Sequence, residues 1–94
     1  MLTYLKPLWM KLPLIKHIVQ FIEENDEDYL EETLEVLEYV CDFSGIKEEE
    51  IDVLGEMISN LYGAIEVHKE MKIGVVKKEA LNNFMKRVQG SIDQ

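Results

Sequence analysis

Apolar residues recur at intervals of three and four positions along almost the whole chain of 94 residues. This spacing places side chains on one face of an α-helix, whereas a half-buried strand needs strict alternation, which no stretch sustains. The pattern predicts four helices, at about 13–24, 26–42, 47–72 and 76–89. We therefore expect an all-α four-helix bundle with a long third helix, formed by residues 13–94 after an N-terminal arm of residues 1–12.

Turn-forming and capping residues lie where these helices should begin and end. Pro13 suits a first helical turn because it lacks an N–H group that would need a partner. Asn25 or Asp26 is expected to cap the second helix. Gly45 is available for a left-handed cap at the end of the second helix, and Gly74 and Gly90 are expected to end the third and fourth helices.

The predicted third helix carries the longest apolar stripe. Six of its residues follow a 3-4-3-4-3 spacing with isoleucine and leucine at alternate heptad positions, a combination that favours two-stranded packing: Ile51, Leu54, Ile58, Leu61, Ile65 and His68. The flanking positions are not the charged residues of an isolated coiled coil but Gly55, Met57, Tyr62 and Ala64. The stripe is therefore wide, and this helix should contact more than one neighbour.

The predicted second helix divides into an apolar and an acidic side. The apolar side comprises Tyr29, Leu30, Thr33, Leu34, Leu37, Val40 and Cys41. The opposite side, called the acidic strip below, comprises Asp28, Glu31, Glu32, Glu35, Glu38, Tyr39 and Asp42. The strip is either a solvated face or a docking surface for a basic protein, with Tyr39 as an aromatic anchor. The basic surface could belong to another protein or to a second copy, through Lys77, Lys78, Lys86 and Arg87.

The net charge of −9 narrows the choice of partners. Nucleic-acid binding and attachment to anionic membranes both need clustered lysine and arginine, so we expect neither. Lysines and prolines interrupt the apolar start of the chain, and no run approaches the ~20 apolar residues of a membrane span. A cytoplasmic location follows as the expectation.

No grouping of residues typical of a catalytic or metal site stands out. A calcium loop starting at Asp26 would place Glu31 where such loops have glycine. Neither His17 nor His68 has a glutamate three residues before it, as a di-iron bundle requires. Cys41 is the only cysteine and lies on an apolar helix side, so we expect a core residue and not a nucleophile. We predict no enzyme and no cofactor; a carboxylate-rich metal-binding bundle stays as an alternative.

Small residues and the arm suggest self-association. Gly55, Ser59 and Gly63 lie four apart, which permits close approach of another backbone, within the bundle or in a second copy. Because a core of this size is thinly stabilised, we expect a homodimer. The candidate residues for its interface are Trp9, Gly55, Ser59, Tyr62 and Gly63. The arm preceding Met10 is either an extension from an alternative start or an apolar strap across a neighbour.

Four runs of the chain resemble a small family of uncharacterised bacterial all-helical proteins: KLPLIKH, FIEENDEDYLEET, IDVLGEMISNLYGAIEVHKE and KKEALNNFMKRVQGSID. The resemblance extends from about Met10 to the C-terminus. It implies no activity and no catalytic residue, but it associates the chain with thioredoxin-like and peroxide-reducing proteins. We therefore expect a non-enzymatic protein–protein interaction module, with an accessory role for a thioredoxin-like partner as the alternative.

Overall fold

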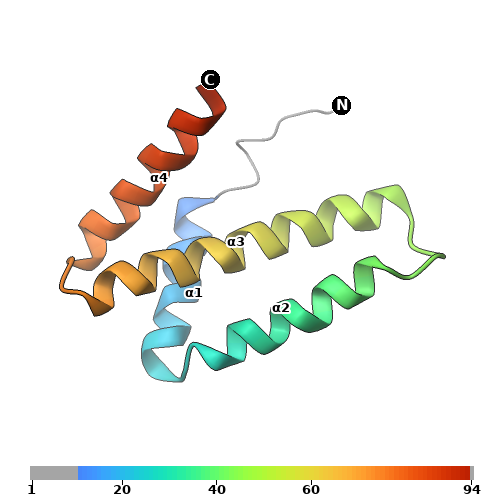
Figure 1. Ribbon diagram of the computed structural model, residues 1–94, viewed down its shortest axis with the longest axis horizontal. Helices are drawn as coiled ribbons and strands as arrows, with labels where there is room; N and C mark the ends of the chain where they lie inside the picture. Colours follow the sequence, from blue (N-terminus) through green and yellow to red (C-terminus); the bar gives the residue numbers. More distant parts are fainter. Residues whose placement is uncertain (1–10, 94) are drawn as a thin grey trace.

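Four helices make up the part of the chain that the computed structural model describes, residues 11–93, with side chains described to residue 88. The helices are α1 (Leu12–Glu24), α2 (Asp28–Cys41), α3 (Glu48–Lys72) and α4 (Lys77–Asp93) (Figure 1). Within these residues there is no strand. The predicted all-α four-helix bundle with a long third helix is confirmed.

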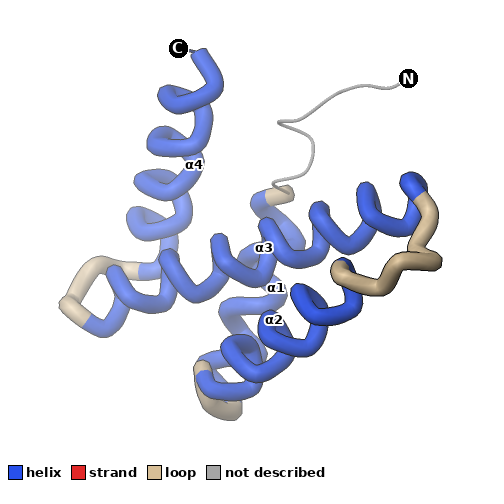
Figure 2. The backbone as a smooth tube through the Cα atoms, turned by 45° about the vertical axis from the view of Figure 1, so that its right-hand side comes forward, coloured by secondary structure: helices blue, strands red, loops and turns tan. Residues whose placement is uncertain are grey.

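Helix α3 is the structural centre of the bundle, because it contacts each of the other three helices. Helix α2 runs antiparallel beside it, while α1 and α4 cross it steeply and also touch each other (Figures 1 and 2). The molecule measures 43 × 32 × 19 Å. The shortest dimension is about two helix diameters, so the bundle is a flat slab two helices thick. The expectation that the third helix contacts more than one neighbour is confirmed.

The core occupies one end of the slab. Every buried residue of α3 lies between Asn60 and Val67, and the buried residues of α2, Leu30 and Leu34, lie in its first half. The first half of α2 meets the second half of α3 because the two helices are antiparallel. The buried apolar side chains are Ile15, Val19, Ile22, Leu30, Leu34, Ala64, Ile65, Val67, Ala80, Leu81 and Phe84.

Ion pairs connect the helices at this core end. Lys77 of α4 contacts Glu23 of α1 at 2.9 Å. Arg87 of α4 contacts Glu70 of α3 at 2.7 Å. Pairs at the surface contribute at most about 1 kcal/mol each, so they orient the helices more than they stabilise the fold.

The helix ends differ from the sequence prediction in several places. Helix α2 ends at Cys41, followed by Asp42 in a right-handed conformation, so the left-handed cap predicted at Gly45 is wrong. Helix α4 starts one residue late and continues through Gly90 to Asp93, so Gly90 is no terminator. Helix α3 ends just before Gly74, as predicted, and Gly74 has a positive φ of 103°.

The start of α2 also uses a different capping device. Glu27 occupies the N-cap position without forming a side-chain cap. The carboxylate of Asp26 instead accepts the N–H of Asp28 at 3.1 Å, two residues further on. Helix α1 begins at Leu12, one residue before the predicted start, and Pro13 still lies in its first turn.

The apolar side of α2 is only partly buried, which corrects the sequence prediction. Leu30 and Leu34 are buried, but Tyr29, Thr33 and Val40 are exposed. Cys41 is half-buried and not a core residue. The exposure of Val40 and Cys41 arises because α2 extends past the point where α1 and α4 pack against α3 (Figure 1).

Candidate docking surface

The α2–α3 hairpin extends beyond the core and carries apolar side chains that nothing in the described structure covers. We call residues 36–57 the hairpin end. Phe43 is 65% exposed and Val53 is 57% exposed. Single exposed apolar residues are ordinary, but seven on one hairpin end are typical of an interaction site. The seven are Val36, Tyr39, Val40, Phe43, Ile51, Val53 and Met57.

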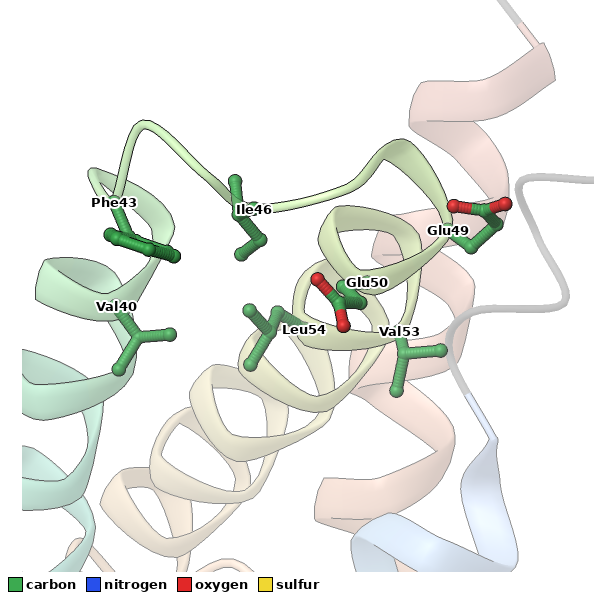
Figure 3. Close-up of a pocket in the computed structure, with 7 residues that line it drawn as sticks. All are labelled: Val40, Phe43, Ile46, Glu49, Glu50, Val53 and Leu54. Carbon is green, nitrogen blue, oxygen red and sulfur yellow. The ribbon is translucent and has the colours of Figure 1, made fainter.

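An open groove of about 540 Å³, called the hairpin groove below, lies between the end of α2 and the start of α3. Figure 3 shows Val40 and Phe43 of the α2 side facing Ile46 and Leu54 across it. The complete lining is Val40, Phe43, Ile46, Glu49, Glu50, Val53 and Leu54. A second hollow, of about 420 Å³, shares Val40 and Phe43 and is bordered by Tyr39 and Asp42.

The loop between the helices holds the groove residues in place through backbone hydrogen bonds. The N–H of Phe43 donates to the carbonyl of Val40 at 3.1 Å, and the N–H of Ile46 donates to the carbonyl of Phe43 at 3.1 Å. A Cβ at Gly45 would lie 2.7 Å from Cζ of Phe43, so the ring of Phe43 lies against Gly45. Glu50 accepts the N–H of Lys47 at 2.9 Å and thereby caps the start of α3.

Carboxylates without ion-pair partners surround this groove. At the core end, Glu23, Glu27 and Glu70 each contact a lysine or arginine. At the hairpin end, none of the described lysines and arginines pairs with Asp42, Glu48, Glu49, Glu50 or Asp52. The potential around the groove is therefore negative and favours a basic ligand.

All seven residues of the acidic strip are exposed. The structure brings Tyr39 and Asp42 to the edge of the apolar hollows, while the earlier strip residues lie nearer the core end. Glu38 accepts a hydrogen bond from the Tyr62 hydroxyl at 2.7 Å, and this bond raises the pKa of Tyr62. The acidic strip therefore adjoins the hairpin groove through its last turn only.

The residues expected in a self-association interface do not share one surface. Gly63 is buried within its own chain, where an added Cβ would lie 3.0 Å from both Ile15 Cδ1 and Phe84 Cζ. Gly55 has open space beside it, Ser59 is half-buried and Tyr62 is exposed. Trp9 lies outside the described residues. The close approach suggested by the small-residue spacing is thus used inside the bundle at Gly63.

The most enclosed charged group is Glu27, near the start of α2. Its Oε1 atom lies 3.0 Å from His68 Nδ1 and 3.3 Å from Lys72 Nζ. Burial alone would raise the pKa of Glu27, but the hydrogen bonds from His68 and Lys72 outweigh it and lower the pKa. The group links the start of α2 to the end of α3, which is a structural role.

The described residues offer neither a metal site nor a membrane span. No group of three or more histidine, cysteine, aspartate or glutamate side chains within them is arranged to hold a metal ion. Among the described helices, none is long and apolar enough to cross a membrane.

Sequence reasoning did not identify the groove as a site. Val53 and Phe43 have the same apolar character as core residues, and helical periodicity does not say which neighbour covers them. One signal was present: the start of the third helix has Val53 and Met57 beside the heptad residues Ile51 and Leu54. This stretch is apolar over more of its circumference than a single neighbouring helix can cover.

A comparison with protein families agrees with the resemblance seen in the sequence. Curated proteins and solved structures gave no match. A family model described as "family of unknown function (DUF6952)" matches residues 10–93, which includes the whole of the hairpin end. The chain therefore belongs to the family of unknown function DUF6952.

Proposed function

We propose that this protein is a non-enzymatic protein–protein interaction module whose docking surface is the hairpin groove with its acidic surroundings. The observation that carries the proposal is the combination of uncovered apolar side chains with unpaired carboxylates on one projecting element. Apolar area supplies binding free energy at roughly 25 cal/mol per Å² buried, while charge complementarity supplies selectivity. The partner segment that fits is apolar on one side and carries lysine or arginine.

An amphipathic helix of the partner is the form of ligand that suits this surface. Helices bind in apolar grooves through side chains at three- and four-residue intervals. The hairpin groove is open to solvent and is bordered by the last turn of α2, the loop that follows it and the first two turns of α3. Basic residues at the edges of the bound helix would face Asp42 and Glu49.

A pair of synthetic peptides tests this proposal in binding measurements by fluorescence anisotropy. One is an amphipathic helix of leucine and lysine, and the other replaces every lysine by glutamate. We expect the lysine peptide to bind and the glutamate peptide to fail. Phe43→Ser with Val53→Ser should weaken binding about tenfold or more, which corresponds to about 1.4 kcal/mol or more.

The matched control replaces exposed apolar residues at the other end of the molecule. Ile73→Ser with Val76→Ser removes side chains that are 79% and 62% exposed, so the chemistry of the change is the same. All four positions are exposed, and each change should alter stability by no more than about 0.5 kcal/mol. Equal loss of binding in both double variants would contradict a docking site at the hairpin end.

The homodimer, the cytoplasmic location and the accessory role for a thioredoxin-like protein stay predictions. A homodimer through Gly55, Ser59 and Tyr62 is compatible with the proposed function. Gly55 and Tyr62 lie on the opposite side of α3 from Val53, because of their spacing along the helix. Such a dimer would leave the hairpin groove accessible.

A further inference from the structure

We propose that residues 1–10 of the chain itself bind in the hairpin groove and compete there with the partner. These ten residues form most of the predicted N-terminal arm of residues 1–12, and they alone are called the arm below. The inference rests on the proposed function, since it concerns the same surface, and it adds a regulator carried by the chain.

The arm starts from a fixed point on α3. The N–H of Lys11 donates to Oδ1 of Asn60 at 3.0 Å, and Asn60 is fully buried. The ammonium group of Lys11 also contacts Glu56 Oε2 at 3.0 Å. Two contacts, one from the backbone and one from the side chain, therefore fix the point from which the preceding ten residues extend.

This fixed point lies on the same side of α3 as one wall of the hairpin groove. Asn60, Glu56, Val53 and Glu49 are spaced by four, three and four residues, so their side chains follow one line along the helix. Val53 and Glu49 belong to the groove lining. From Asn60 to Val53 the distance along the axis is about 10 Å. Ten extended residues span up to about 33 Å, so the arm reaches the groove.

The composition of the arm complements the groove. Its sequence, MLTYLKPLWM, contains three leucines, one tyrosine and one tryptophan, together with Lys6 and no acidic residue. The groove is lined by apolar side chains and surrounded by carboxylates that lack ion-pair partners in the described structure. An apolar segment with one positive charge therefore suits it.

The alternative occupant, the hairpin end of a second copy, is less favourable. Pairing two hairpin ends would bring together two sets of unpaired carboxylates, and like charges across an interface are costly. The arm also has an advantage over a second copy, because its covalent attachment raises its local concentration at the groove. A short flexible tether gives an effective concentration in the millimolar range, so that even a weak contact is largely occupied.

Trp9 provides a direct test because it is the only tryptophan in the chain. In the full-length protein we expect blue-shifted tryptophan emission and reduced quenching by acrylamide. Phe43→Ser with Val53→Ser should shift the emission to the red and raise quenching, since it removes the apolar contacts. Ile73→Ser with Val76→Ser should change neither.

Two results would overturn the inference. One is emission that does not respond to Phe43→Ser with Val53→Ser, even if Trp9 is shielded from acrylamide. The other is a blue shift that vanishes on dilution, since binding within one chain is independent of concentration.

The leucine–lysine peptide, which contains no tryptophan, separates this inference from the proposed function. We expect it to shift the Trp9 emission to the red as it displaces the arm. If the peptide binding depends on Val53 but the Trp9 emission does not, the arm inference is wrong and the docking site stands. If the emission depends on Val53 but the peptide does not bind, the proposed function is wrong and the arm contact stands.

Discussion

Asn60 shows how a single polar residue in the core determines the placement of a helix. Its side chain is fully buried, with Oδ1 accepting the N–H of Lys11 and Nδ2 donating to the carbonyl of Glu56 at 2.7 Å. The N–H of a residue just before a helix has no partner within that helix. Asn60 supplies this partner and so joins the start of α1 to the middle of α3.

Asn60→Ala should lower the free energy of unfolding by about 1–3 kcal/mol, because it removes two hydrogen bonds made by a buried side chain. Urea denaturation measures the change. Asn82→Ala, at an exposed position of α4, is the control and should cost no more than about 0.5 kcal/mol. Equal losses in the two variants would argue against the role given to Asn60.

Glu27 makes stability depend on pH. The pKa of Glu27 lies below 4.5 in the folded protein because the hydrogen bonds from His68 and Lys72 outweigh burial. A carboxyl whose folded pKa is lowered stabilises the fold above its unfolded pKa, and this stabilisation disappears as the pH falls through the folded pKa. The melting temperature of the wild type should therefore fall below about pH 4.5.

Glu27→Gln should lower stability by about 1 kcal/mol at neutral pH, because it removes a charged hydrogen-bond acceptor. It should also reduce the fall in melting temperature on acidification. Glu32→Gln, at an exposed carboxylate on the same helix, should leave the pH profile unchanged. A Glu27→Gln profile parallel to that of the wild type would contradict this assignment.

At the scale of helices, the sequence determined the faces better than the ends. Period 3.6 correctly predicted four helices and the buried positions Leu30, Leu34 and Ile65. The ends were less predictable because glycine permits a left-handed conformation without requiring one. Gly74 adopts it, whereas α4 continues through Gly90.

The site was less predictable than the fold, for a physical reason. An apolar stripe shows that a helix face avoids water, but the covering partner depends on how distant segments pack. The apolar stripe of α3 from Ile51 to His68 is continuous in sequence, yet Ile51 is 37% exposed whereas Ile65 is 6% exposed. The place where α1 and α4 stop covering α3 is a tertiary property that periodicity does not contain.

The two interior glycines of α3 should respond differently to the same change. Gly55→Ala should raise the free energy of unfolding by about 0.5–1 kcal/mol, because alanine favours the helix and no atom lies within 4 Å of the new methyl group. Gly63→Ala should lack this gain, because its methyl group would lie 3.0 Å from Ile15 Cδ1 and Phe84 Cζ. Urea denaturation of both variants checks the difference, and equal stabilisation would contradict the packing around Gly63.

The molecule as a whole has a packed end and an open end. The buried core and the ion pairs of Lys77 and Arg87 lie at one end, while the hairpin end combines uncovered apolar residues with carboxylates that lack ion-pair partners among the described residues, except Glu56, which contacts Lys11. A small domain gains little stability from exposing such residues, and the proposed docking function rests on this contrast.

Formation of a homodimer is a further prediction about the whole molecule. Light scattering at micromolar concentration should give twice the chain mass of 11.0 kDa. Gly55→Leu should return the mass toward that of one chain, because a large side chain would separate the two copies of α3. A single-chain mass for the wild type would rule out the dimer and leave the hairpin groove unaffected.

Mapping the binding of the leucine–lysine peptide by amide chemical shifts tests the central claim most directly. The proposed docking site predicts the largest shifts at the amides of Val40, Phe43 and Val53, with little change at Ile73 and Val76. Shifts concentrated on α1 and α4, or spread evenly along the acidic side of α2, would contradict it.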